Sequence, residues 1–472
     1  MNFLTALYPH QQAAVDKLSK LKVGALYMEQ GTGKTRTTLE LIRRRLCAEK
    51  VNRVLWLCPC SIKRNLQNDI IHHCGALPDE IVIRGIESLS ASDKLFMELL
   101  KLIENNKVYL VVDESNLVKN IKAKRTARIV ELSKKCTYKL ILNGTPASRN
   151  ESDLFAQWYV LDWRILGYKT FWGFASNHLE FKKIVLPNGR EVVTDQITRV
   201  LNIDYLSEKI APYTFQILKA DCLDLPKKHY YKQYFSLTDE QRILYFKVKE
   251  QYLLAVEEIR PDTIYKLFTA LQHVVSGRCV LTPPDKTMKT APMFKDFHDN
   301  PRIDTLIDIL DDYIGDEKCI IFAKYQTEID TIAELLEERG QSFKIFTGKV
   351  PQKQRQENLT SFRDSAQFLI ANKSCGAYGL NLQFCRNVIF YSNDFDLATR
   401  LQSEDRVHRI GQTQEVRIFD IYAGGTIDEL IVNCLERKEN MIDAFKRGIK
   451  EQGGTNASLF GRKRFVGGTQ TH

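Results

Sequence analysis

The chain has 472 residues, 44% of them hydrophobic and 27% charged, so it is long enough for several globular domains and too apolar to be disordered throughout. The net charge of +10 favours a polyanionic partner, most often nucleic acid, although solubility alone could explain it in a chain of this length. Residues 1–7 do not resemble a secretory signal and no apolar run approaches the length of a bilayer span. We therefore expect a soluble, intracellular protein of the bacterial or host cytoplasm, without membrane contact and with its eleven cysteines reduced.

From residue 1 to about 150, short apolar runs alternate with helical patterns. The expected strands are Val23–Met28, Val54–Cys58, Ile81–Ile83, Val108–Val112 and Lys139–Leu142. Apolar strands separated by helices are typical of a parallel sheet with helices on both faces, and right-handed crossovers make such a domain doubly wound. Ligands bind to this fold at the carboxyl ends of the strands.

A glycine loop with the sequence M-E-Q-G-T-G-K-T follows the first strand and precedes a helical pattern. Gly31 and Gly33 let backbone N–H groups turn toward an anion at a helix N-terminus. Lys34 could then reach the β- and γ-phosphates of a nucleotide, and Thr35 could offer its hydroxyl to magnesium. Met28 replaces the first glycine of the usual G-x-x-x-x-G-K-[ST] pattern, so a plain glycine turn is the alternative interpretation.

An acidic pair follows a further strand of this domain. Asp113 and Glu114 come directly after the run at 108–112. An Asp at a strand end beside a phosphate loop can hold magnesium, and the next Glu can polarise an attacking water. Cys58, Cys60 and the H-H-C run at 72–74 suggest zinc, but their spacing matches no known zinc pattern.

Residues 150–220 interrupt this alternation with an aromatic, helical stretch and a hairpin. Asn188 and Gly189 separate two β-branched runs, which is a strong hairpin signal. The hairpin, 182–193, carries Lys182, Lys183 and Arg190. A basic hairpin of this kind could act as a wedge that separates DNA strands, and the alternative is a surface hairpin packed on its own domain.

Residues 226 to about 300 are expected to be mostly helical, and the strand–helix alternation then returns. The expected strands are Cys319–Phe322, Phe343–Phe346, Phe368–Ala371, Val388–Tyr391 and Val416–Ile421. We expect Arg406 and Arg409 to share one face of a helix, from which they could supply the cations that a phosphate site in the other domain lacks. The glycine-rich, basic stretch 448–472 indicates a flexible tail.

Taken in order, these motifs resemble those of the helicase-like ATPases of superfamily two, and specifically their SWI/SNF-related branch. The resembling segments are Leu7–Gln11 (the adenine-reading motif), Gln30–Thr35 (motif I), Leu57–Lys63 (Ia), Asp113–Asn116 (II), Gly144–Pro146 (III), Cys319–Tyr325 (IV), Ser374–Leu382 (V) and Arg406–Gln412 (VI). Motif VI is the most branch-specific of them. The chain departs from the family pattern at Thr32, Asn116 and Tyr378, and Asn116 leaves open how DNA binding is coupled to hydrolysis. The length suggests a compact prokaryotic or phage-type motor.

The resemblance implies an α/β fold of two RecA-like, doubly wound parallel-sheet lobes, which we place at 1–220 and 221–447, with a helical and β-hairpin insertion at 150–220. The implied ATP-binding residues are Gln11, Gln30, Gly31, Thr32, Gly33, Lys34, Thr35 and Gly379. The implied catalytic residues are Lys34, Asp113, Glu114, Arg406 and Arg409, with Thr35 and Asp113 on magnesium. The candidate DNA contacts, all sequence-independent, are Lys63, Thr145, Lys324, Thr347, Lys349 and Asn372. The strand-separating hairpin is represented by Lys182, Lys183, Asn188, Gly189 and Arg190.

The expected function is that of a monomeric, ATP- and magnesium-dependent motor on duplex, forked or four-way DNA. It would unwind forks or drive branch migration in replication, recombination or repair. The alternatives are a motor that displaces proteins or RNA polymerase from DNA, an RNA helicase, and a nucleic-acid clamp without ATPase activity.

Overall fold

The computed structural model describes residues 2–144, 154–185, 191–254, 261–283, 287–372 and 380–437. The chain divides into two compact units, of which the first ends at Leu225 and the second starts at Pro226. Each unit contains its own six-stranded sheet, in which every pairing between described strands is parallel. The predicted fold class, two parallel-sheet α/β lobes, is therefore confirmed.

The sheet of the first unit has the strand order β3-β2-β4-β5-β1-β8. Its strands are β1 (Val23–Met28), β2 (Arg53–Cys58), β3 (Ile81–Gly85), β4 (Val108–Val112), β5 (Tyr138–Asn143) and β8 (Thr214–Ile217). The first five were predicted to within two residues at each end. Strand β8 was not predicted, and it pairs with β1 on the side opposite β5.

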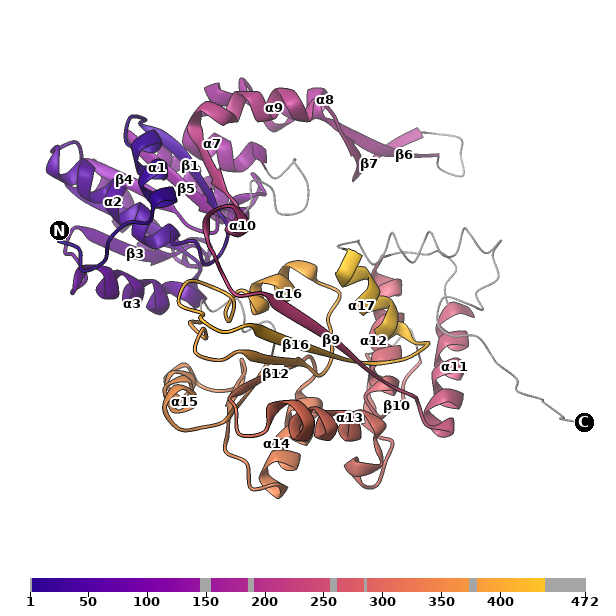
Figure 1. Cartoon of the computed structure of the whole chain (residues 1–472). Coiled ribbons are helices and arrows are strands. Elements are labelled where there is room, and N and C mark those ends of the chain that lie inside the picture. The colour runs from indigo at the N-terminus through magenta and orange to yellow at the C-terminus, as the bar shows by residue number, and fades with distance from the viewer. Residues whose placement is uncertain are drawn as a thin grey trace, which may run out of the picture. The chain divides into compact units, whose positions relative to one another are not determined.

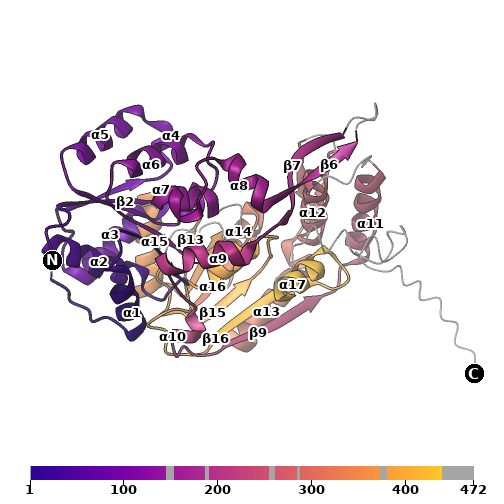
Figure 2. The same cartoon turned by 90° about the horizontal axis from the view of Figure 1, so that it is seen from above.

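Helices cover both faces of this sheet because its strands are apolar on both sides. Leu26 and Met28 point into a core formed with α1, α2 and α3, whereas Ala25 and Tyr27 point into a core formed with α5, α6 and α7. The two layers are visible from above in Figure 2. The helices are α1 (Pro9–Leu18), α2 (Lys34–Cys47), α3 (Lys63–Cys74), α4 (Ser88–Ala91), α5 (Asp93–Glu104), α6 (Lys124–Lys134), α7 (Leu154–Leu166), α8 (Phe171–His178), α9 (Ile203–Ile210) and α10 (Lys219–Cys222).

The predicted hairpin is present in the insertion between β5 and β8. Strands β6 (Leu179–Val185) and β7 (Glu191–Val200) pair antiparallel in a separate two-stranded sheet, which extends as an arm beyond α8 and α9 (Figure 1). A side-chain bond from Thr194 Oγ1 to the carbonyl oxygen of Lys182, at 2.9 Å, adds to the ladder. Asn188, Gly189 and Arg190 lie outside the described residues.

The sheet of the second unit has the order β13-β14-β12-β15-β16-β9. Its strands are β9 (Lys228–Phe235), β12 (Cys319–Ala323), β13 (Phe343–Phe346), β14 (Phe368–Asn372), β15 (Asn387–Phe390) and β16 (Val416–Ala423). The expectation that the region from 226 onward is mostly helical is wrong at its start, because β9 pairs with β16 over eight residue pairs. The unit also contains a small antiparallel pair, β10 (Arg278–Val280) and β11 (Thr290–Pro292).

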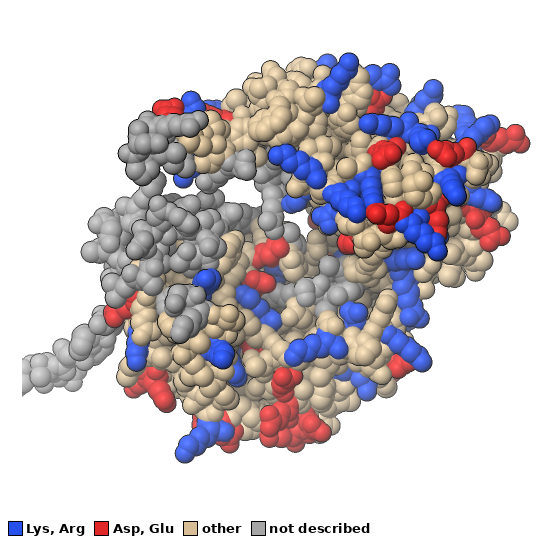
Figure 3. Space-filling model, turned by 180° about the vertical axis from the view of Figure 1, so that it is seen from behind, with Lys and Arg blue, Asp and Glu red and all other residues tan. Residues whose placement is uncertain are grey.

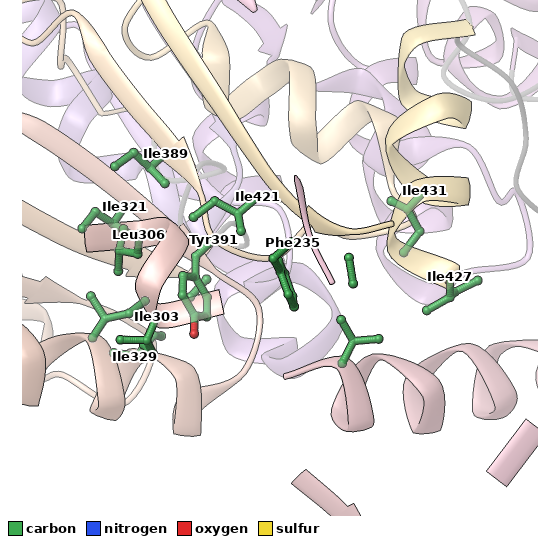
Figure 4. Close-up of a cluster of buried hydrophobic side chains, with 14 of the residues drawn as sticks. Phe235, Ile303, Leu306, Ile321, Ile329, Ile389, Tyr391, Ile421, Ile427 and Ile431 are labelled. Atoms are coloured by element: carbon green, nitrogen blue, oxygen red, sulfur yellow. The ribbon is translucent and has the colours of Figure 1, made fainter. Parts of the chain in front are cut away.

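A large hydrophobic core lies between one face of the second sheet and the helices that cover that face. Ile303 and Leu306 of α13 lie against Ile321, Tyr391 and the other strand residues drawn in Figure 4. The helices are α11 (Asp239–Leu254), α12 (Pro261–Val275), α13 (Pro301–Ile309), α14 (Gln326–Glu338), α15 (Gln352–Asp364), α16 (Leu397–Glu404) and α17 (Ile427–Arg437). Within the described ranges, none of the helices in either unit combines the length and the apolar character that crossing a membrane requires.

Candidate nucleotide-binding site

The glycine loop connects β1 to α2 at the carboxyl edge of the first sheet. Gly31 and Gly33 have φ values of +83° and +88°. Residues with a Cβ atom rarely adopt this left-handed backbone conformation, whereas glycine adopts it readily. A Cβ atom at Gly33 would lie 2.0 Å from Nε2 of Gln11. Helix α2 begins at Lys34, so its free N–H groups open onto the loop. The loop is therefore shaped to receive an anion.

The segment Leu7–Gln11, which was predicted to read adenine, is bonded directly to this loop. Gln11 accepts the N–H of Tyr8 through Oε1, at 3.0 Å, and donates through Nε2 to the carbonyl oxygen of Thr32, at 3.2 Å. Nε2 of His10 lies 2.8 Å from the same oxygen. His10, which is buried, was missed from the sequence, although its position next to Gln11 in one helical turn was a usable signal.

Two basic residues at the start of α2 form hydrogen bonds within the first unit. Nζ of Lys34 donates to the carbonyl oxygen of Met28, at 2.8 Å. Arg36, also missed from the sequence, donates through Nε to the carbonyl oxygen of Thr5, at 3.1 Å, and forms a buried ion pair with Glu40. Arg36 thus attaches the N-terminal segment to the helix that follows the loop.

The acidic pair lies at the carboxyl end of β4. Burial, then the charge of Glu114, raises the pKa of Asp113 to about 7, and the ammonium group of Lys34 opposes that rise. Strands β1 and β4 run parallel in one sheet, so the glycine loop after β1 and the acidic pair after β4 both lie at its carboxyl edge. Glu114 has a left-handed backbone, with φ +47° and ψ +55°, and its N–H donates to Oδ1 of Asp113 at 2.9 Å. Such strain in a residue other than glycine costs about 1–3 kcal/mol and is concentrated at functional sites.

The donor groups at this edge are suited to ATP and magnesium. Oε1 of Gln30 and Nδ2 of Asn143 are buried and have no hydrogen-bond partner among the described residues, so both can bond a ligand. Magnesium is usually held by one or two carboxylates together with substrate phosphates, which matches Asp113 beside the loop and the adjacent hydroxyl of Thr35. In the described ranges, no cluster of three or more His, Cys, Asp or Glu residues could hold a metal ion by itself.

The arginines of motif VI do not lie on a helix, so that prediction was wrong. Helix α16 ends at Glu404, and residues 405–411, here called the arginine turn, form a series of turns. Gly411 has φ +97°, and Nε2 of Gln412 donates to the carbonyl oxygen of Cys385 at 3.1 Å, which draws the chain away from the helix axis. Arg406 and Arg409 belong to the second unit, whereas the glycine loop belongs to the first. Gly379 lies outside the described residues.

The side chains of the candidate DNA contacts differ in their exposure to solvent and in the hydrogen bonds that they already form. Lys349 is exposed, and Lys63 is half-buried at the first position of α3. Lys324 is engaged inside its own unit, where its Nζ donates to Oε1 of Gln272 at 2.8 Å. Thr347 is buried, Asn372 donates to the carbonyl oxygen of Lys324 at 2.9 Å, and Thr145 lies outside the described residues.

The insertion exposes both basic and apolar side chains. Lys182 and Lys183 on β6 are exposed, and Lys183 is only 4.0 Å from the exposed carboxylate of Glu191. Val193 on β7 is 59% exposed and Trp172 on α8 is 63% exposed. The Trp172 ring lies 6.3 Å from that of Phe181, centroid to centroid, so an indole stands in solvent at the base of the hairpin.

Comparison with known proteins identifies two domains. The profile of the SNF2-related domain matches residues 77–278, and the profile of the helicase conserved C-terminal domain matches residues 301–411. The TATA-binding protein-associated factor mot1 of Aspergillus fumigatus is 25% identical over 96% of this chain and 27% of its own length. The human SWI/SNF-related matrix-associated actin-dependent regulator of chromatin subfamily A member 1 is 26% identical over 70% of this chain and 31% of its own length. The chain thus spans about a third or less of these curated relatives.

Among solved structures, the Sulfolobus solfataricus SWI2/SNF2 ATPase core in complex with dsDNA aligns with a TM-score of 0.41 and 22% identity, covering 96% of this chain and 94% of that one.

Proposed function

Because the chain belongs to the SNF2-related helicase-like ATPases of superfamily two and is an ATP-hydrolysing enzyme, we propose that it uses hydrolysis to move along DNA and to separate the strands of forked or four-way DNA. The observation that carries this proposal is the β6–β7 arm, which is inserted into the unit that holds the nucleotide loop. Both relatives named above carry names that refer to chromatin or to a TATA-binding protein, which supports DNA as the track. The net positive charge of the chain agrees with movement along the phosphate backbone of DNA.

In this proposal the glycine loop and the acidic pair bind and activate the nucleotide. Lys34 leaves the Met28 carbonyl and pairs with the β- and γ-phosphates. Asp113 and the Thr35 hydroxyl hold magnesium, which supplies charge neutralisation on the phosphates when bound. Glu114 orients and polarises the attacking water from its strained backbone position.

Arg406 and Arg409 supply the cationic charge that stabilises the transferring phosphoryl group. They come from the second unit, so hydrolysis depends on both units. This dependence is what allows a cycle of ATP binding and hydrolysis to be converted into movement along a polymer.

The track on the second unit is proposed to include Lys349, whose exposed ammonium group is free of the internal contacts that hold Lys324. On the face in Figure 3, Lys and Arg side chains are numerous over the first unit, with a few acidic side chains among them. Contacts of this kind recognise phosphates rather than bases, so binding would be independent of sequence and sensitive to salt.

Strand separation is assigned to the insertion. Its first helix, α7, is anchored to the acidic motif, because Ser115 Oγ donates to Oε1 of Gln157 at 2.6 Å and both residues are fully buried. The insertion is therefore built on the turn that senses the nucleotide. Trp172 presents an exposed indole on which an unpaired base could stack, an interaction worth about 1–3 kcal/mol per base.

The test uses two variants of the full chain, one in which residues 187–190 are shortened to a two-residue turn and one carrying Trp172→Ala. Unwinding of a labelled fork should fall about tenfold in each, while ATP hydrolysis stimulated by linear duplex stays within twofold. Trp163→Ala, an aromatic substitution in α7 outside the hairpin, serves as the matched control. Undiminished fork unwinding in both variants would refute the wedge assignment.

A second candidate function is a motor that displaces proteins from DNA, which the similarity to a TATA-binding protein-associated factor over 96% of the chain favours. Hydrolysis-dependent release of a protein roadblock from linear duplex, with no activity on forks or four-way junctions, would select this function. A clamp without hydrolysis does not agree with membership of an ATP-hydrolysing family.

A further inference from the structure

The chain enters the second unit at Pro226 and immediately forms β9, the edge strand of that sheet. The carbonyl oxygen of Pro226 lies 2.8 Å from Nε2 of His408, which stands between the two motif VI arginines in the sequence. A carbonyl oxygen only accepts hydrogen bonds, so this imidazole carries its proton on Nε2. The first residue of the second unit is therefore bonded to the arginine turn.

A second contact joins the arginine turn to the beginning of β9, through Lys228 and Tyr230. Lys228 Nζ and the Tyr230 hydroxyl both donate to Oε2 of Glu404, at 2.9 and 2.8 Å. Glu404, the last residue of α16, is only 2% exposed, and a buried carboxylate is costly unless it is paired. Burial pushes the pKa of Glu404 up, but Arg400 and Lys228 outweigh burial and hold that pKa below its usual value. An ionised Glu404 thus fastens the start of the arginine turn to β9.

The opposite side of the arginine turn is held by the loop that precedes β15. The carbonyl oxygen of Arg406 accepts the N–H of Leu382, at 3.0 Å, and the guanidinium group of Arg409 donates to Oδ1 of Asn381. The turn is therefore fixed on two sides. The β9 side is the one that leads directly to the connection with the first unit.

We propose that His408 and Lys228 are positioning residues that fix the arginine turn to the point where the chain enters the second unit. The proposal rests on the role assigned above to Arg406 and Arg409. The Lys228–Glu404 bond is charge-assisted and the His408–Pro226 bond adds a second attachment, so a shift in the path of the chain at Pro226 moves the arginine turn with it. The connection between the units then sets the placement of the guanidinium groups, on which the hydrolysis rate depends. The affinity for ATP depends mainly on the glycine loop of the first unit.

The experiment compares His408→Ala and His408→Gln in the full chain, with DNA-stimulated ATP hydrolysis as the readout. A glutamine amide can donate to the Pro226 carbonyl as the imidazole does, whereas alanine cannot. We expect His408→Ala to lower kcat about tenfold with KM for ATP within twofold of wild type, and His408→Gln to recover most of the rate. His298→Ala, which removes an exposed histidine of the same unit, is the matched control.

Lys228→Met and Lys228→Arg test the second contact in the same way, and the arginine variant should retain the rate because it keeps the charge. Rates are divided by the fraction of chains that bind nucleotide, so that partial unfolding is not counted as lost catalysis. Wild-type kcat in both His408→Ala and Lys228→Met would overturn the proposal. Arg406→Ala is measured alongside: if it leaves kcat unchanged, the proposed arginine role fails and the positioning role fails with it. If Arg406→Ala lowers kcat and His408→Ala does not, the positioning role alone is wrong.

Discussion

The ammonium nitrogen of Lys34 lies 2.8 Å from the carbonyl oxygen of Met28, the residue that stands where the phosphate-loop pattern has its first glycine. The backbone at this position contributes an acceptor, and the buried Met28 side chain packs in the core under α2. The missing glycine therefore does not disable the loop. In the proposed mechanism, Lys34 exchanges this carbonyl for a phosphate when the nucleotide binds.

Replacement of Lys34 by alanine should abolish the cationic contact to the phosphates while leaving the fold intact. We expect Lys34→Ala to lower kcat for ATP hydrolysis by about 10²–10³-fold, the usual effect of losing one transition-state contact. The melting temperature is measured alongside, because the variant also loses the bond to the Met28 carbonyl and the positive charge that acts on Asp113. Rates above one tenth of wild type would show that the loop is not the phosphate site.

Replacement of Gly33 by alanine tests the contact between the glycine loop and Gln11, the predicted adenine reader. The new methyl group would lie 2.0 Å from Nε2 of Gln11, so Gly33→Ala should raise KM for ATP as well as destabilise the first unit. Gly167→Ala is the matched control, because Gly167 has nearly the same φ, +86°, with no atom within 4 Å of the added methyl group. The control should cost about 1–2 kcal/mol of unfolding free energy from backbone strain alone and leave KM unchanged. Equal KM values in the two variants would contradict this account.

Lys349 and Lys324 should respond differently to removal of charge. Lys349→Ala should weaken DNA binding equally for all sequences and reduce the slope of log affinity against log salt by about 1. Lys324→Ala should instead lower thermal stability, because its ammonium group is bonded to Gln272 and paired with Asp394 at 3.4 Å. The measurements are fluorescence anisotropy on duplex DNA across a salt series and thermal melting. An unchanged salt slope in Lys349→Ala would remove this residue from the track.

Stability should fall on mild acidification because of His73. Burial, followed by the charges of His72 and Arg36, lowers the pKa of His73 to about 4, while its Nδ1 lies 2.8 Å from the Thr5 hydroxyl. An unfolded chain takes up this proton near pH 6.5, so between about pH 6.5 and 4 the unfolded state binds more protons and stability decreases as pH falls. The urea midpoint should therefore drop between pH 7 and 5, and less so in His73→Gln. The exposed neighbour, in His72→Gln, is the control, and equal pH dependence in all three proteins would rule the explanation out.

The buried strands were predictable because each is apolar on both faces and is bounded by turns. Val23–Met28 and Val108–Val112 were predicted at their observed ends for this reason. Strand β9 was missed because its sequence, K-H-Y-Y-K-Q-Y-F, mixes charged and aromatic residues on an edge strand. Its partner β16 lies far along the chain, and a local sequence pattern does not record such a pairing.

The candidate site was predictable where a motif fixes the backbone, as at the left-handed Gly31 and Gly33, and the roles of Lys34, Thr35 and Asp113 stay predictions. It was not predictable where a contact joins separate segments. The bond from His10 to the Thr32 carbonyl and the bond from Ser115 to Gln157 belong to this class. The arginine turn was misassigned because three-residue spacing is shared by helices and by consecutive turns, and only the contact of Gln412 with Cys385 decides between them.

Strands β5 and β8 lie on either side of β1 and run parallel to it, so the chain must cross over one strand to pass from the first to the second. A parallel crossover requires only about a dozen residues, usually one helix, and α7 alone would satisfy that requirement. The crossover from β5 to β8 therefore does not require the remaining elements of the insertion, which are α8, the β6–β7 arm and α9. An engineered change in the length of this region therefore leaves the pairing of β1 with β5 and β8 intact, so the arm can be altered separately from the strand that carries the glycine loop.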